Sequence, residues 1–154
     1  MTTIRDLFSI STVPVEMVYQ TRALLLLDGN ESAAQFSGDR HAVAFHVAVF
    51  QADAIVAVAS VCPEKRIQDG TEGDWRLRGL AVSPELQGLG FGRTLVRLCG
   101  VHACGNGGST LWCTARESAK SFYDSLSFTQ VGQAFSIPGR NDTRFYAMTF
   151  DLGR

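Results

Sequence analysis

The stretch Gln87–Thr94 reads QGLGFGRT and places glycine at three alternate positions. The run before it, 75–82, has the composition of a β-strand, and the segment after it, 91–102, has apolar residues at helical spacing. A glycine turn at such a junction exposes backbone N–H groups at the positive end of a helix dipole, which suits a phosphate or a pyrophosphate. The same turn is needed wherever the chain adopts positive φ without any ligand. The stretch therefore predicts strand, loop and helix, and leaves both readings of the loop open.

Two common phosphate-binding patterns do not fit this loop. A Walker A loop that ended at Gly92 would need glycine at position 87 and lysine at position 93, where the chain has Gln87 and Arg93. The dinucleotide fingerprint G-x-G-x-x-G, begun at Gly88, would need glycine or alanine at Arg93. Both departures count against a nucleotide-binding module that takes ATP or NAD.

Size and composition indicate one domain that spans 1–154. The chain has 154 residues, 45% of them hydrophobic, with a formal net charge of −1 and a pI of about 6.3. Such a chain buries a sizeable core and has no excess of positive charge for nucleic acid or an anionic membrane surface. The aliphatic run Ala23–Leu27 is far shorter than a membrane span, and the first residues lack the build of a secretory signal. We therefore expect no nucleic-acid partner and no membrane partner.

The cysteines and histidines do not have the spacing of a metal site. No C-x-x-C pair occurs among the four cysteines, and the three histidines do not complete a zinc site with them. We expect free, mostly buried thiols, no metal ion, and a location in the reducing cytoplasm.

Hydrophobic periodicity outlines a mixed α/β domain without repeats or linkers. In the strand 75–82 the two-residue alternation slips at Gly79, which predicts a β-bulge. Residues 4–10 form a further candidate strand. The other expected elements are helices over about 14–27, 91–104 and 119–126, and strands over 41–50, 54–62, 75–82, 109–115, 128–137 and 145–152.

The loop and its flanking segments resemble the GNAT superfamily of acyl-CoA-dependent N-acetyltransferases. Gln87–Gly92 reads Q-x-x-G-x-G, LRGLAVSPE lies before it and LWCTARESAKSFYDSLSF follows it. The resemblance is strongest over 75–128, where strand, bulge, loop, helix, strand and tyrosine-bearing helix occur in the family's order. It implies a mixed, mostly antiparallel sheet of about six to seven strands with splayed central strands, flanked by helices. It also implies an enzyme that uses acetyl-CoA to acetylate an amine.

The resemblance also implies which residues bind the cofactor. Backbone groups of the strand before the loop would pair with the pantetheine arm, and N–H groups of the loop would cradle the pyrophosphate. Thr114 stands where the family commonly has asparagine, and Ser127 replaces the glycine of the family's LGF sequence. The cofactor-binding residues implied are Leu80, Ala81, Val82, Gln87, Gly88, Leu89, Gly90, Phe91, Gly92, Arg93, Thr94, Thr114, Ala119, Phe122 and Tyr123.

Four residues are candidates for catalysis. Tyr123 matches the family tyrosine that acts as general acid toward the leaving thiolate, and the N–H of Leu80, freed by the bulge, is placed to stabilise the developing oxyanion. The general base has no fixed position in the family. Glu72 and His46 are the candidates, although a solvated charge and a satisfied histidine are the more common explanations of such residues. Arg22 either reads an anionic group of the acceptor or extends along the edge of an apolar helix face.

The sequence leaves two functions in competition. One is an acetyl-CoA-dependent N-acetyltransferase, and the other is a non-catalytic CoA-binding or regulatory domain of the same fold. The acceptor would be a small-molecule or peptide amine whose identity the sequence does not reveal. Both a monomer and a homodimer are compatible with the pattern.

Overall fold

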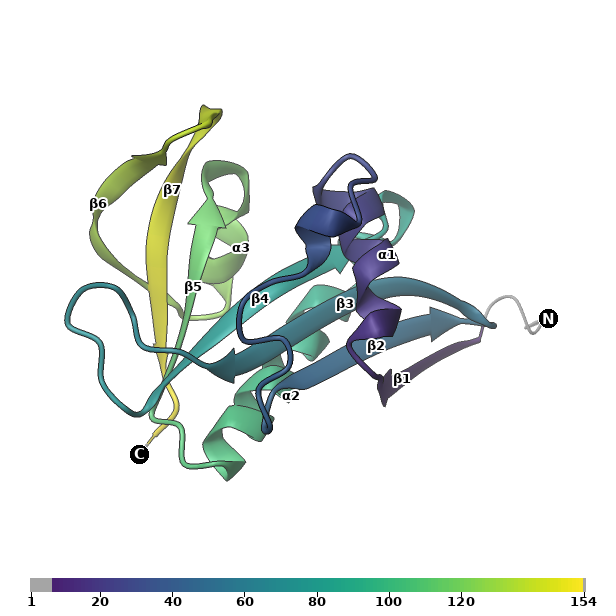
Figure 1. The fold of residues 1–154 in the computed structure, drawn as a ribbon, viewed down its shortest axis with the longest axis horizontal. Coiled ribbons are helices and arrows are strands. Elements are labelled where there is room, and N and C mark those ends of the chain that lie inside the picture. The colour runs from purple at the N-terminus through teal and green to yellow at the C-terminus, as the bar shows by residue number, and fades with distance from the viewer. Residues whose placement is uncertain (1–6, 154) are drawn as a thin grey trace.

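A seven-stranded sheet forms the centre of the molecule in the computed structural model, which describes residues 7–153. The strands are β1 (Phe8–Thr12), β2 (Phe45–Gln51), β3 (Ala54–Pro63), β4 (Asp74–Val82), β5 (Thr110–Arg116), β6 (Thr129–Ile137) and β7 (Arg140–Asp151). Their order in the sheet is β1-β2-β3-β4-β5-β7-β6 (Figure 1). All neighbours are antiparallel except β4 and β5, which are parallel. The expected mixed, mostly antiparallel sheet is confirmed.

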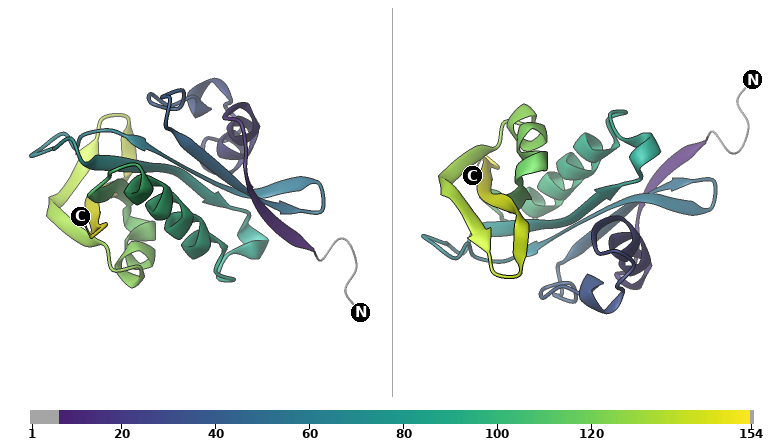
Figure 2. Two further views of the ribbon diagram at one scale, coloured as in Figure 1. Left: turned by 90° about the horizontal axis from the view of Figure 1, so that it is seen from below. Right: turned by 90° about the horizontal axis from the view of Figure 1, so that it is seen from above.

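Helices cover both faces of the sheet. The helix α1 (Glu16–Leu26) lies on one face, and α2 (Phe91–Gly105) and α3 (Lys120–Ser125) lie on the other (Figure 2). Each of the three falls within a helix expected from the sequence, to within a residue or two at the ends. Short 3₁₀ turns complete the connections, namely η2 (Ser32–Ala34), η3 (Pro84–Leu86) and η4 (Glu117–Ala119).

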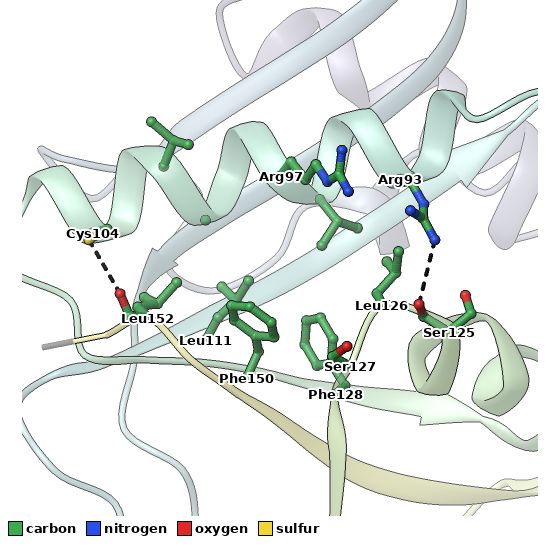
Figure 3. Close-up of a pocket in the computed structure, with 13 residues that line it drawn as sticks. Arg93, Arg97, Cys104, Leu111, Ser125, Leu126, Ser127, Phe128, Phe150 and Leu152 are labelled. Carbon is green, nitrogen blue, oxygen red and sulfur yellow. Dashed lines mark hydrogen bonds between the residues drawn. The ribbon is translucent and has the colours of Figure 1, made fainter.

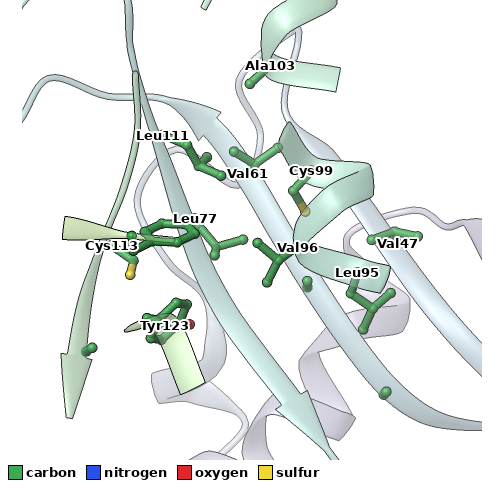
Figure 4. Close-up of a cluster of buried hydrophobic side chains, with 14 of the residues drawn as sticks. Val47, Val61, Leu77, Leu95, Val96, Cys99, Ala103, Leu111, Cys113 and Tyr123 are labelled. Atoms are coloured by element: carbon green, nitrogen blue, oxygen red, sulfur yellow. The ribbon is translucent and has the colours of Figure 1, made fainter. Parts of the chain in front are cut away.

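Two hydrophobic clusters hold the layers together. The larger one packs α2 and α3 against the sheet, with Leu95 and Cys99 of α2 fully buried (Figure 4). The smaller one packs Val15 and Val18 of the α1 segment against β2, β3 and β4. Because both faces are covered, the middle of β3 is buried without interruption and has no two-residue alternation.

The last hairpin differs from the sequence-based expectation. The final strand was expected to begin near residue 145, with 139–144 as a loop, but β7 begins at Arg140. Ile137 pairs with Arg140, so that Pro138 and Gly139 make a two-residue turn in which Gly139 has a φ of +81°. The early residues of β7 are mostly exposed, and for that reason they lack the apolar alternation that marks a strand.

The candidate first strand, 4–10, is confirmed only in its second half. β1 begins at Phe8 and pairs antiparallel with β2 at the edge of the sheet. Residues 4–6 lie outside the part of the chain that the structure describes.

Candidate active site

The glycine loop joins β4 to the first turn of α2. Gly88 and Gly90 have φ angles of +81° and +93°, which favour glycine, and a Cβ atom at either position would meet nothing within 4 Å. Gly90 is the N-cap of α2, and within residues 7–153 no side chain caps this helix end. The Gln87 side chain donates from Nε2 to the Val82 carbonyl oxygen at 3.1 Å and fastens the loop to the end of β4. The loop thus presents uncapped backbone N–H groups beside open space, as an anion site requires.

Gly92 has a different role from the other two glycines. A Cβ atom at this position would lie 3.2 Å from the Phe122 ring, so that the absence of a side chain lets α2 approach α3 closely. The contact brings the start of α2 beside the helix that carries Tyr123. One glycine of the loop therefore positions a catalytic candidate, while two leave the loop open.

The strands β4 and β5 diverge next to the loop. They pair only from Asp74↔Thr110 to Arg76↔Trp112, and no β5 residue in the described range pairs with the rest of β4 (Figure 1). On the other side of β4, the register with β3 shifts between the pairs Val58↔Ala81 and Ser60↔Arg78, where Gly79 has a φ of +63°. The predicted bulge at Gly79 and the splay of the central strands are both present.

Tyr123 lies on α3 beneath this splay and is only 7% exposed. Its ring packs edge-on against Phe122 and Phe128, with centroid distances of 5.1 and 5.3 Å. Burial, together with its neighbour Cys113, raises the pKa of Tyr123 well above the ordinary value (Figure 4). The phenol is therefore protonated at neutral pH and is a proton or hydrogen-bond donor.

Cys62, Cys99 and Cys113 are buried structural thiols. Burial raises the pKa of Cys113 to about 12 and that of Cys62 to about 11, and it also raises the pKa of Cys99. A thiol with a pKa that high is not a nucleophile at neutral pH. All four cysteines are free, as expected from the sequence.

Thr114 lies on the opposite face of the sheet from Tyr123. Along β5 the side chains of Leu111, Cys113 and Ala115 enter the large core under α2 and α3. Successive strand residues face opposite sides, so Trp112 and Thr114 face the side that carries α1, where both line a cavity. Thr114 therefore points to the opposite face of β5 from Cys113 and Tyr123, and its contact with the cofactor stays a prediction.

Glu72 is not placed to act as a base. It lies in the loop before β4, where its carboxylate forms an exposed ion pair with Lys65 at 2.7 Å. Leu80 and the bulge lie near the other end of β4, roughly 20 Å further along the strand from Asp74. The candidate role of Glu72 is not supported. Glu72 and Leu80 are only eight positions apart in sequence, but the extended strand between them keeps them far apart in space.

His46 is also unavailable as a base, because both ring nitrogens are occupied inside the protein. Nδ1 lies 2.6 Å from Ser60 Oγ, and Nε2 lies 2.9 Å from the Asp39 carbonyl oxygen. Since the carbonyl only accepts, Nε2 carries the proton and Nδ1 accepts from the Ser60 hydroxyl. Sequence reasoning placed His46 on a strand but had no signal for these two partners.

Arg22 completes the same buried network. Its guanidinium is fully buried and donates to both Asp39 carboxylate oxygens at 2.7 and 3.0 Å, to Ser60 Oγ and to the Ala34 carbonyl. The Phe36 ring stacks on it at 4.2 Å. Arg22 therefore neither reads an acceptor anion nor extends along a helix edge. Its partners come from segments far apart in the sequence, which no local pattern reveals.

Unfolding of the protein should show a pH dependence that His46 carries. Burial lowers the pKa of His46 below 6.5. Between the lowered folded pKa and 6.5, His46 is therefore mostly protonated in the unfolded chain and mostly neutral in the folded chain. The free energy of unfolding should therefore fall as the pH is lowered from above 6.5 toward the depressed folded pKa, where this loss levels off. Urea titrations at pH 7.5 and 5.5 measure the effect, and His46→Gln should show a smaller loss than the wild type. An equal loss in both proteins would remove His46 as the cause.

Two cavities open on opposite sides of the sheet. The first, of about 590 Å³, lies between α2, the end of α3 and the end of β7, and Arg93 and Arg97 of α2 line it (Figure 3). The second, of about 520 Å³, lies between the loop 64–73 and strands β5, β6 and β7, and is called the Trp112 cavity below. Its polar side chains are Arg66, Gln68, Thr114 and Gln133. The other lining residues are Ile67, Trp112, Val131, Gly132, Ala134, Phe135, Ala147 and Met148.

The family is established by comparison with known proteins. The model of the acetyltransferase (GNAT) domain matches residues 41–130, which is more than half of the chain. The chain therefore belongs to the GNAT family and is an acetyl-CoA-dependent N-acetyltransferase. It is 26% identical over 134 residues to the uncharacterized N-acetyltransferase YitI of Bacillus subtilis, a match that covers 86% of this chain and 90% of that protein.

Solved structures show the same fold. A putative GNAT acetyltransferase from Desulfovibrio desulfuricans aligns with a TM-score of 0.72 and 17% identity, covering 96% of this chain and 100% of its own. An aminoglycoside 6'-N-acetyltransferase in complex with coenzyme A also aligns with a TM-score of 0.72 and 17% identity, covering 95% of this chain and 98% of its own.

At residues 7–153, no helix is long and apolar enough to cross a membrane.

Proposed function

We propose that acetyl-CoA binds across the glycine loop and the splayed end of β4. The main support for this site is that Gly88 and Gly90 leave the start of α2 without a side-chain cap and beside open space. A pyrophosphate there would accept hydrogen bonds from N–H groups within 88–93 and would gain from the dipole of α2. The N–H groups of Gln87 and Thr94 already donate to the carbonyl oxygens of Pro84 and Gly90. The backbone of Leu80–Val82, which has no partner on β5 in the described chain, is available to pair with the pantetheine amides. The complex of a related fold with coenzyme A supports the same donor.

In this arrangement Leu80 and Tyr123 have separate roles in the reaction. Acetyl-CoA supplies the activated thioester, and the nitrogen of a neutral amine attacks its carbonyl carbon. The N–H of Leu80, beside the bulge at Gly79, would donate to the carbonyl oxygen as negative charge develops on it. As the carbon–sulfur bond breaks, Tyr123 would give its phenolic proton to the departing sulfur, which leaves as the thiol of CoA. The nitrogen, now bonded to the acetyl carbon, would release one proton to solvent, and the tyrosinate would take one back from solvent. The amine must arrive unprotonated, because an ammonium has no lone pair for attack.

Calorimetric titration tests the donor site. Acetyl-CoA and CoA should bind with a Kd in the micromolar range, about −8 kcal/mol, while ATP and NAD bind much more weakly. Absence of CoA binding, or a preference for ATP or NAD, would overturn the proposal. Binding without turnover over a panel of amines would favour a non-catalytic CoA-binding domain instead.

Gly90→Ala locates the site within the protein. The added methyl group projects into the open space proposed for the pyrophosphate, so the Kd for acetyl-CoA should rise about tenfold or more. Gly107→Ala is the matched control, since Gly107 also has positive φ and open space at its Cβ position but follows the other end of α2. Both variants should lose similar stability, about 1 kcal/mol each. Equal acetyl-CoA affinity in the two would exclude the loop as the phosphate site.

We also propose that the protein is located in the cytoplasm. The four free thiols support a reducing compartment such as the cytoplasm.

A further inference from the structure

The Trp112 cavity lies next to the point where β4 and β5 separate, on the other face of the sheet from Tyr123. Pairing between β4 and β5 ends at Arg76↔Trp112, and Thr114, the next residue of β5 on that face, borders both the splay and the cavity. An acceptor held in the cavity would therefore reach the gap between these strands from the side opposite the glycine loop.

The walls of the Trp112 cavity are mainly apolar. Trp112 provides an indole that is held in place because its Nε1 donates to the Glu64 carbonyl at 2.7 Å and because Arg76 stacks on its ring at 4.7 Å. Phe135 and Val131 line the β6 side and are 39% and 42% exposed. On the loop side, Ile67 lines the cavity and is 97% exposed.

The charges that line the cavity are as informative as its apolar walls. Among the described residues that line it, none is an aspartate or a glutamate, and the one charged side chain is Arg66. Arg66 lies 3.7 Å from the buried Asp74 carboxylate, so its own charge is already compensated. A polyamine or an aminoglycoside would lose water from several ammonium groups here without gaining a carboxylate partner.

We propose that the Trp112 cavity binds the uncharged, aromatic body of the amine acceptor, so that the enzyme acetylates arylalkylamines in preference to polycations. This inference rests on the proposed function. A cavity of about 520 Å³ accommodates one or two rings. The amino group would be the acceptor's single charged group before it loses its proton. A free arylalkylamine and a peptide whose first residue is aromatic share this chemistry.

Binding is tested first, because it needs no turnover. The chain has two tryptophans, so ¹⁵N-labelled protein gives two indole N–H signals. Trp112 lines the cavity, whereas Trp75 lies in the core on the other face and serves as an internal control. Addition of 2-phenylethylamine should shift the Trp112 signal saturably and leave the Trp75 signal unchanged, and spermidine should shift neither. A Trp112 signal that does not respond to 2-phenylethylamine would overturn the inference.

Kinetics then measure the preference. With acetyl-CoA saturating, kcat/KM for 2-phenylethylamine should exceed that for spermidine and for kanamycin by about 100-fold, equivalent to about 2.7 kcal/mol. The peptide Phe-Ala-Ala amide distinguishes the two sources of the aromatic amine. Comparable rates for the peptide and 2-phenylethylamine indicate a peptide acceptor, and a rate at background for the peptide indicates a small molecule. Faster acetylation of spermidine or kanamycin would overturn the proposal.

Two variants tie the preference to the cavity. Phe135→Ala should raise KM for 2-phenylethylamine about tenfold with kcat within about twofold, because the ring contributes to binding in ground and transition states alike. Gln133→Glu adds one negative charge at equal size and should narrow the preference over spermidine about tenfold. Leu24→Ala, an exposed apolar position on α1, is the control and should change neither. If acetyl-CoA fails to bind in calorimetry, the proposed function itself fails. If it binds and these variants behave like Leu24→Ala, only the assignment of the cavity fails.

Discussion

Tyr123→Phe should lower kcat by about 100-fold or more while the Kd for acetyl-CoA changes less than about twofold. Phenylalanine keeps the ring contacts with Phe122 and Phe128 and removes only the hydroxyl group. Without that proton the sulfur must leave as a free thiolate in a buried site, which is costly. Steady-state kinetics with a saturating amine and calorimetry with acetyl-CoA measure the two quantities on the same protein.

A matched variant separates loss of the acid from general damage. Tyr19→Phe removes the hydroxyl of another tyrosine, on α1 and across the sheet, and should leave kcat unchanged. The pH profile adds a second test, because burial keeps Tyr123 protonated well above pH 10. Wild-type kcat should therefore show no descending limb below about pH 10. Equal turnover of Tyr123→Phe and wild type would remove the residue from the mechanism.

Arg22→Met should destabilise the fold by about 3 to 5 kcal/mol, the usual cost of removing one partner from a buried ion pair. The substitution leaves the Asp39 carboxylate, which is 7% exposed, without its bidentate partner, and it also removes the donor to Ser60 Oγ. Urea unfolding at pH 7.5 measures the loss. The Arg22 side chain also packs directly against the bulge, because a Cβ atom at Gly79 would lie 2.7 Å from Arg22 Nε. Arg22→Met should therefore also alter the packing around Gly79.

A double-mutant cycle identifies the ion pair as the cause. Asp39→Ala combined with Arg22→Met removes both charges, so the double variant should be clearly more stable than the sum of the two single losses predicts. Arg40→Met is the surface control, because Arg40 pairs with Glu16 at 3.0 Å while both side chains are more than half exposed. Its loss should lie within the error of the measurement. Additive losses at Arg22 and Asp39 would show that the two side chains do not act as a pair.

The parts of this protein that were predictable from sequence are those whose causes are local. The glycine loop, the start of α2 and the bulge at Gly79 depend on backbone conformations that only nearby residues determine, and each lies where the pattern put it. The helices followed from apolar spacing. The order of motifs over 75–128 predicted the GNAT family, and with it acetyl-CoA as the donor; the family is confirmed.

Tertiary structure decided the features that depend on partners distant in sequence. His46 and Arg22 meet Asp39 and Ser60 only because α1, the loop before β2, and β3 pack together, and this converts a candidate base into a buried structural group. Thr114 faces the Trp112 cavity because the register between β5 and β7 decides which β5 side chains point to each face of the sheet. A cavity is the space that remains between segments after packing, so no stretch of sequence encodes it alone. The sequence by itself therefore identified the family and its acetyl donor, whereas the cavity that we propose for the acceptor depends on tertiary packing.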